Sequence, residues 1–170
     1  MRGYLFLLLI ALFFSGTGCD KDNTTDPAVI GELDKQFLLS AADDALFQVN
    51  AGQLAASGTT QKNIQDYGEE MTKDNTQAGQ ELQKLAGDRQ VELPTTLSDE
   101  RQQQLDSLAM QKSEGLDTLY LNQMIAIQER VVHMMEIEGA SGKDPELKQW
   151  AEDRLPVVRE FEERVKAMRE

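Results

Sequence analysis

The chain has 170 residues and a formal net charge of -13 at pH 7, with a single cysteine and a single histidine. This charge excludes a nucleic acid as a partner, because the phosphate backbone is also negative. One cysteine also excludes an internal disulfide, so the fold must be stabilised by packing.

The first 18 residues are typical of a secretory signal peptide. Arg2 is followed by the apolar stretch YLFLLLIALFF and by four small residues at positions 15–18. The apolar stretch has about half of the ~20 residues that a helix needs to cross a bilayer. The sequence therefore predicts that residues 1–18 are a cleaved signal and not a permanent anchor.

Cys19 directly follows these small residues, and this arrangement resembles the lipobox of bacterial lipoproteins. The resemblance implies lipidation of the Cys19 thiol, after which Cys19 is the first residue of the mature protein. Gly16 departs from the usual pattern, which has Leu three positions before the cysteine. The alternative is an ordinary exported thiol or half of an intermolecular disulfide. We expect lipidation, because a lone exposed thiol has little use in an oxidising compartment.

Residues 19–31 are predicted to comprise the lipidated cysteine and a flexible tether, since they are polar and show no apolar period. The following domain is then attached to a bacterial membrane in the cell envelope, at the outer membrane or on the periplasmic face. The membrane, through the lipid on Cys19, and an unidentified envelope protein are the expected partners.

Residues 32–170 are predicted to form one helical domain, because apolar residues recur every three or four positions. Long helices are expected over residues 32–57, between Thr60 and Gly87, over residues 116–138 and from Asp144 to about Met168, with a short helix over residues 98–112. Four amphipathic helices of this length bury their apolar stripes best as an antiparallel bundle, so the expected fold class is all-α.

Several residues are predicted to set the ends of these helices. Ser98 and Asp144 are expected N-caps, and Pro145 suits a first helical turn. Gly115 is expected to divide the short helix from the long one that follows. Pro156 is expected to kink the last helix without ending it, because the apolar period continues beyond it.

Short stretches of the predicted bundle resemble the domain of unknown function 4142 family. The most specific is SGKDPELKQWAEDRLP at residues 141–156; the others are Gly52 to Ala55, Met71 to Asp74, Glu81 to Ala86, and Tyr120 with Met124. The resemblance implies an exported, ferritin-like antiparallel four-helix bundle with one short extra helix in the long connection. It implies no particular activity, because none is established for the family.

The ferritin-like shape raises the hypothesis of a di-iron centre. Such a centre needs a carboxylate from each of two helices and a Glu-x-x-His pair from each of the other two. This chain has only His133, and Arg130 stands three positions before it. Glu129 and Glu136 lie one turn on either side of His133, but three neighbours on one helix do not complete a coordination shell. We therefore expect no metal. The sequence also has no Gly-rich phosphate loop, no G-x-S-x-G motif and no Cys/His pair, so we expect no other cofactor and no enzymatic activity.

The family resemblance also indicates where relatives carry potential ligands. It places histidines at the positions that Asn75, Gln128 and Phe161 occupy here, and acids near Gln48 and Asn50. Amides and a phenyl ring are poor ligands for transition metals. The resemblance thus implies a lost metal site and a non-catalytic protein with a binding or structural role. A ferritin-like protein that binds or oxidises metal is the alternative.

Asn75 lies on the apolar stripe of its helix and must find hydrogen-bond partners, because an unpaired buried amide costs about 1–3 kcal/mol. Asn50 and Gln128 are predicted to supply them. This candidate buried polar cluster is either a ligand pocket or a hydrogen-bond network that fixes the register of the helices. We favour the network, which is how buried asparagine acts in coiled coils.

Overall fold

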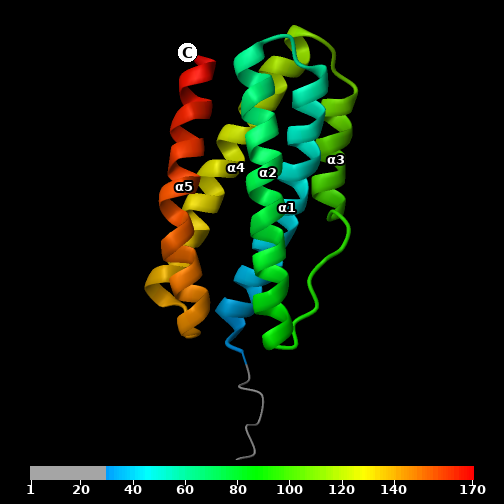
Figure 1. The fold of residues 1–170 in the computed structure, drawn as a ribbon. Coiled ribbons are helices and arrows are strands. Elements are labelled where there is room, and N and C mark those ends of the chain that lie inside the picture. The colour runs from blue at the N-terminus through cyan, green and yellow to red at the C-terminus, as the bar shows by residue number, and fades with distance from the viewer. Residues whose placement is uncertain (1–29) are drawn as a thin grey trace, which may run out of the picture.

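The structure, a computed structural model, describes residues 30–170, which form five α-helices and no strand (Figure 1). The helices are α1 (Glu32–Gly58), α2 (Lys62–Asp88), α3 (Asp99–Ala109), α4 (Glu114–Ser141) and α5 (Pro145–Arg169). The all-α fold class expected from the apolar period is confirmed. The predicted signal peptide, Cys19 and the tether up to residue 29 lie outside the described residues.

Two antiparallel helix pairs, α1 with α2 and α4 with α5, form the bundle (Figure 1). The connection between the pairs runs the length of the bundle, and α3 lies within it against α1. One crossover of this kind is characteristic of ferritin-like bundles. Helix α3 is the short extra helix that was expected in the long connection.

The predicted N-caps are present. The Ser98 side chain accepts a hydrogen bond from the backbone N–H of Arg101 at the start of α3. Asp144 Oδ1 accepts from two backbone N–H groups in the first turn of α5. These contacts satisfy amides that have no partner within the helix, so the local sequence determines where α3 and α5 begin.

One helix boundary differs from the prediction. Helix α5 continues through Pro156, as expected. The break before α4 lies at residues 110–113 and not at Gly115, which is already in the first turn of α4. Ser113 carries the turn with a φ of 52°, in the left-handed region that non-glycine residues seldom adopt.

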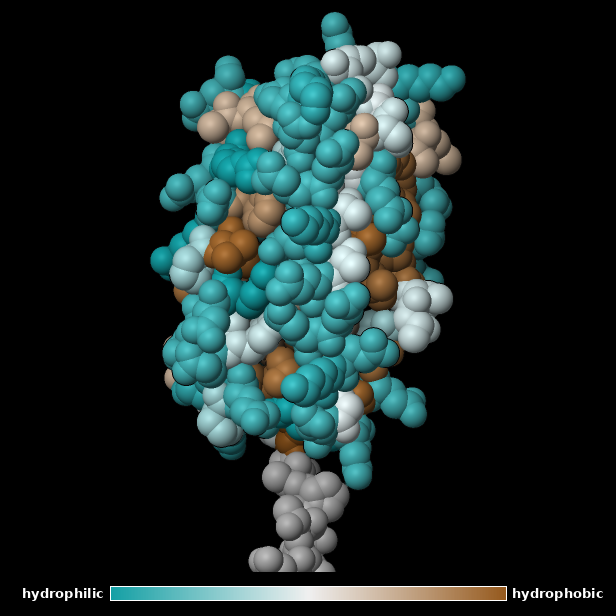
Figure 2. Space-filling model, viewed as in Figure 1, coloured by the Kyte–Doolittle hydropathy of each residue, from teal (hydrophilic) through white to brown (hydrophobic). Residues whose placement is uncertain are grey.

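The apolar stripes of the helices meet in one core along the bundle axis. Its bulkiest fully buried apolar members are Tyr67, Tyr120, Phe47, Leu38, Ile64, Met71, Leu82, Leu108, Met124 and Leu147. On the face that Figure 2 shows, the projecting side chains are mostly hydrophilic and the apolar ones are recessed between helices. In the described part of the chain, no helix has the length and apolar character of a membrane span.

Helices α1 and α2 approach each other closely where Gly52 faces Gly68. A Cβ atom at Gly52 would lie 2.6 Å from the carbonyl oxygen of Gly68, and one at Gly68 would lie 2.7 Å from the carbonyl oxygen of Gly52. No side chain tolerates such a distance to backbone, so this crossing requires glycine on both helices.

Replacing Gly68 with alanine should therefore force α1 and α2 apart. We expect Gly68→Ala to lower the free energy of unfolding by about 1–3 kcal/mol, as overpacking does in other cores. Gly79→Ala is the matched control, because a Cβ at this position of α2 meets nothing within 4 Å. It should stabilise the helix by about 0.5–1 kcal/mol. Urea unfolding measures both, and equal midpoints would contradict the assigned crossing.

Candidate functional site: a polar cluster inside the bundle

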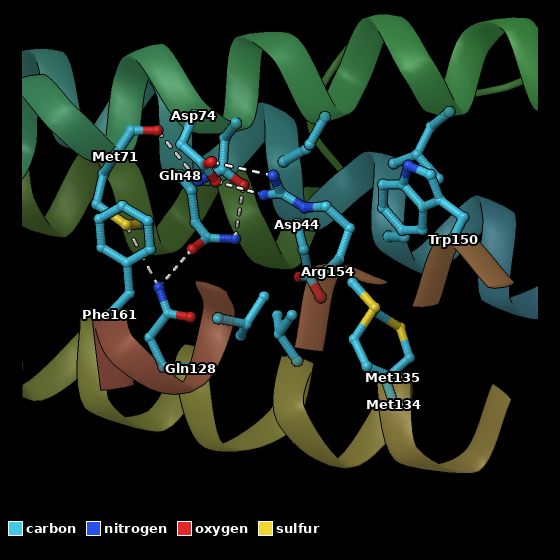
Figure 3. Close-up of a pocket in the computed structure, with 17 residues that line it drawn as sticks. Asp44, Gln48, Met71, Asp74, Gln128, Met134, Met135, Trp150, Arg154 and Phe161 are labelled. Carbon is cyan, nitrogen blue, oxygen red and sulfur yellow. Dashed lines mark hydrogen bonds and ion pairs between the residues drawn. The ribbon is translucent and has the colours of Figure 1, made fainter. Parts of the chain in front are cut away.

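A small cavity lies in the interior, lined by residues of α1, α2, α4 and α5 (Figure 3). Its volume is about 20 Å³, which is close to the space that one water molecule needs. The polar and sulfur-containing residues around it are Asp44, Gln48, Met71, Asp74, Asn75, Gln128, Met134, Met135, Trp150 and Arg154. A polar interior of this kind is the natural place to look for function in a bundle.

Three amides at this cavity form a continuous chain of hydrogen bonds. Gln128 of α4 donates through Nε2 to Oε1 of Gln48 of α1 at 2.8 Å. Gln48 donates through its own Nε2 to Oδ1 of Asn75 of α2 at 3.3 Å. Asn75 donates onward to the carbonyl oxygen of Met71 at 3.1 Å. The chain, which Figure 3 shows, joins three helices in the interior.

The structure brings two of the three predicted cluster residues together. Asn75 and Gln128 are buried and share Gln48 as their common partner. The prediction of Asn50 was wrong, because Asn50 is half-buried and donates to the carbonyl oxygen of Leu46 in its own helix.

Gln48 was the residue that sequence reasoning missed. It lies two positions before Asn50, and two positions correspond to a rotation of about 200° around a helix. Gln48 is also three residues after Ala45 and four before Gly52, which are both buried members of the α1 stripe. The helical period of α1 thus contained the signal that favours Gln48.

The two acids that line the cavity are paired with arginine. Asp44 of α1 is 1% exposed and forms ion pairs with Arg101 of α3, at 2.6 Å, and with Arg130 of α4. Asp74 of α2 accepts two hydrogen bonds from the guanidinium of Arg154 of α5. A neighbouring guanidinium repels other cations, so these carboxylates are poor candidates for metal ligands.

The positions that the family resemblance associates with histidine do converge. Asn75, Gln128 and Phe161 all line the cavity. His133 lies elsewhere and is exposed. Over residues 30–170, no three His, Cys, Asp or Glu side chains are grouped closely enough to hold a metal ion.

The candidate acids beside His133 are also engaged. Glu129 pairs with Lys166, and Glu136 pairs with Arg159. The cavity also has three potential metal ligands that are neither charged nor amides. They are the thioether sulfurs of Met71, Met134 and Met135.

The antiparallel bundle with one long crossover connection has the ferritin-like arrangement. The chain belongs to the family described as domain of unknown function DUF4142, which matches residues 20–168. The resemblance inferred from the short stretches is therefore confirmed. No curated protein matches the chain.

Solved structures with a similar fold include two of CopM. CopM in the Cu(I)-bound form has a TM-score of 0.68 and 15% sequence identity, over 79% of this chain and 94% of that chain. CopM in the Cu(II)-bound form has a TM-score of 0.65 and 14% identity, over 80% of this chain and 95% of that chain. At this identity the likeness shows a shared fold and nothing about a shared site.

The convergence of three positions on the cavity can be tested by placing histidines there. The triple variant Asn75→His, Gln128→His, Phe161→His should bind Zn²⁺, because three imidazoles from three helices supply most of a tetrahedral shell. Binding to the folded state raises the melting temperature by mass action, so thermal unfolding with and without Zn²⁺ measures it.

The control for this variant exchanges one position. In Asn50→His, Gln128→His, Phe161→His, the first histidine lies outside the cavity, so Zn²⁺ should have a much smaller effect. A folded Asn75 variant that ignores Zn²⁺ would show that the three side chains do not meet in solution.

Proposed function

We propose that this protein is a lipid-anchored, non-catalytic helical bundle of the bacterial cell envelope, with a binding or structural role. One observation carries the proposal: each acid and amide at the central cavity already has a protein partner. Acid–base chemistry needs a group that is free to exchange protons with a substrate, and a metal needs uncommitted ligands. Here these groups hold helices together.

The anchoring part of the proposal rests on the N-terminal sequence. Cys19 follows a signal-like segment, and the bundle begins at Glu32. The dozen residues between them have a root-mean-square reach of roughly 20 Å if they are flexible. The net charge of -13 repels anionic head groups. A lipid would thus hold the bundle near the membrane while its acidic surface stays available to a partner.

Replacing Cys19 tests the anchor directly. Cys19→Ser should abolish labelling by radioactive palmitate and shift the protein from the membrane fraction to the soluble fraction. The melting temperature of the purified bundle should not change, because Cys19 precedes the helices. Wild-type protein that carries no label and has a different mature N-terminus would contradict the proposal.

A second candidate function is the binding of Cu(I). The observation that favours it is the presence of three methionines at the cavity, with Met71 at one end and Met134 and Met135 at the other (Figure 3). Thioether sulfur is a soft ligand that suits Cu(I), and a nearby arginine does not occupy it. The similar fold of copper-bound CopM is consistent with this candidate.

Competition with a chromophoric Cu(I) chelator separates the two functions. The primary proposal expects the wild type and the variant Met71→Leu, Met134→Leu, Met135→Leu to compete equally poorly. Copper binding instead predicts one tight Cu(I) per wild-type chain that the triple variant loses. Met110→Leu is the matched control, because Met110 is 79% exposed and is not among the residues that line the cavity. Tight Cu(I) binding by the wild type and by Met110→Leu, but not by the triple variant, would contradict the primary proposal and favour copper binding.

A further inference from the structure

A pair of buried carboxyl groups lies at the end of the bundle where α1 begins. Asp34 in the first turn of α1 is 0% exposed, and Glu138 in the last turn of α4 is 1% exposed. Both are therefore removed from water, although ionised carboxylates strongly prefer it. The start of α1 and the turn between α4 and α5 lie at this same end (Figure 1).

Asp34 connects these two elements. Its Oδ1 accepts hydrogen bonds from the backbone N–H groups of Lys143 at 2.7 Å and of Asp144 at 3.0 Å. Both donors lie in the turn between α4 and α5 and are about 110 residues away in the chain. The start of α1 is thereby attached to the opposite helix pair.

The three remaining carboxyl oxygens of Asp34 and Glu138 accept no hydrogen bond from residues 30–170. Asp34 Oδ2 and both Oε atoms of Glu138 are buried with no hydrogen-bond partner among the described residues. Both carboxyl groups lie against the same turn: a Cβ atom at Gly142 would clash with Oε1 of Glu138, and the next residue, Lys143, donates its N–H to Asp34. Two adjacent carboxylates cannot both ionise at low cost, whereas one proton between them satisfies an oxygen on each.

The charges that face the pair from neighbouring elements do not neutralise it. The carboxylate of Asp144 adds negative charge, and Lys148 of α5 is the positive group that favours ionised Glu138. Arg89 at the end of α2 is held by Asp144 and Glu146.

On the α4 side, Glu138 shares a groove with Arg130 and His133. Arg130 is paired with Asp44, and His133 is exposed to solvent. Neither group provides Glu138 with a buried counter-charge.

Of the two carboxyl groups, Glu138 is the one whose pKa is raised. Burial raises the pKa of Glu138 to about 7, and the negative charges of Asp34 and Asp144 act in the same direction. Burial alone would also raise the pKa of Asp34, but the N–H groups of Asp144, Lys143 and Asp34 itself, together with the Glu138 carboxyl, outweigh it and hold that pKa below its usual value.

We propose that Asp34 and Glu138 share one proton and form a pH-controlled latch between the start of α1 and the turn that joins α4 to α5. In the closed latch, the Glu138 O–H donates to Oδ2 of Asp34. When the proton leaves to solvent, two buried carboxylates face each other and repel. The latch then weakens at the end of the bundle where the chain enters it.

A divalent cation is the other species that could satisfy these oxygens. Calcium requires six to eight oxygen ligands, and magnesium requires six. Only Asp34 and Glu138 offer uncommitted carboxylate oxygens here, because Arg89 holds Asp144. The geometry thus favours a proton.

The direction of the pH effect follows from linkage. The pKa of Glu138 is about 7 in the folded protein and takes its ordinary value of 4.5 in the unfolded chain. The stabilisation by the bound proton is therefore complete below the lower value and lost as the pH rises through the higher one. Over this window, the unfolding equilibrium constant should increase by up to about tenfold per pH unit.

Glu138→Gln tests the latch, because its amide donates to Asp34 at every pH and never ionises. The melting temperature of the wild type should fall between pH 5.5 and pH 8, whereas that of the variant should stay nearly level and exceed the wild type at pH 8. Glu152→Gln, at an exposed position of α5, is the matched control and should follow the wild type. A wild type without this slope, or a variant that keeps it, would overturn the proposal.

A local measurement separates the latch from general stability. After correction for intrinsic rates, hydrogen exchange at the amides of Lys143 and Asp144 should speed up from pH 6 to pH 8 in the wild type but not in Glu138→Gln. Exchange that is equally protected at both pH values would overturn the latch.

Two further outcomes are decisive without depending on how well the variant folds. The ¹³C resonance of the Glu138 carboxyl in the wild type should titrate near pH 7, and a midpoint near its ordinary pKa of 4.5 would overturn the proposal. Stoichiometric stabilisation of the wild type by Ca²⁺ or Zn²⁺ at pH 8 would overturn it in favour of a cation site.

Discussion

The hydrogen-bond chain from Gln128 through Gln48 to Asn75 determines how the two helix pairs of this bundle meet. An unpaired buried amide costs about 1–3 kcal/mol, so a shift of either pair that breaks the chain is penalised more than once. Apolar contacts alone tolerate many registers, because they have no direction. The amide chain selects one of them, and the close crossing at Gly52 and Gly68 keeps α1 and α2 in position to make it.

The charged groups in the interior also need partners, and these partners come from other helices. Asp44 brings Arg101 of the crossover helix and Arg130 of α4 to one point, and Asp74 joins α2 to Arg154 of α5. The Asp44–Arg101 pair is buried on both sides; such a pair adds little net stability, but removing one partner costs about 3–5 kcal/mol. This pair therefore specifies an arrangement more than it strengthens it. Asp34 and Glu138 are the exception, since there a carboxyl group has another carboxyl group as its neighbour.

The residues at the central cavity indicate which functions this bundle can have. Where the family resemblance associates histidines with a metal, the chain has Asn75, Gln128 and Phe161, and the two amides are bonded through Gln48. Each acid and amide at the cavity is engaged by at least one protein group, although Oδ2 of Asp44 accepts no hydrogen bond from residues 30–170, and this engagement is why we favour a non-catalytic role. The thioether sulfurs of Met134 and Met135 are potential copper ligands at the cavity, and that of Met71 accepts a hydrogen bond from Gln128; these sulfurs are the subject of the copper experiment.

The sequence by itself determined the helices, their caps at Ser98 and Asp144, the all-α class, and the burial of Asn75 and Gln128. These properties depend on residues within one or two turns of each other, so a periodic pattern records them. Only the tertiary structure decided that Gln48 bonds to both Asn75 and Gln128, and that Asp34 lies at the same turn as Glu138. Such contacts depend on the rotation of each helix about its axis and on which helices become neighbours, and no local pattern carries that information.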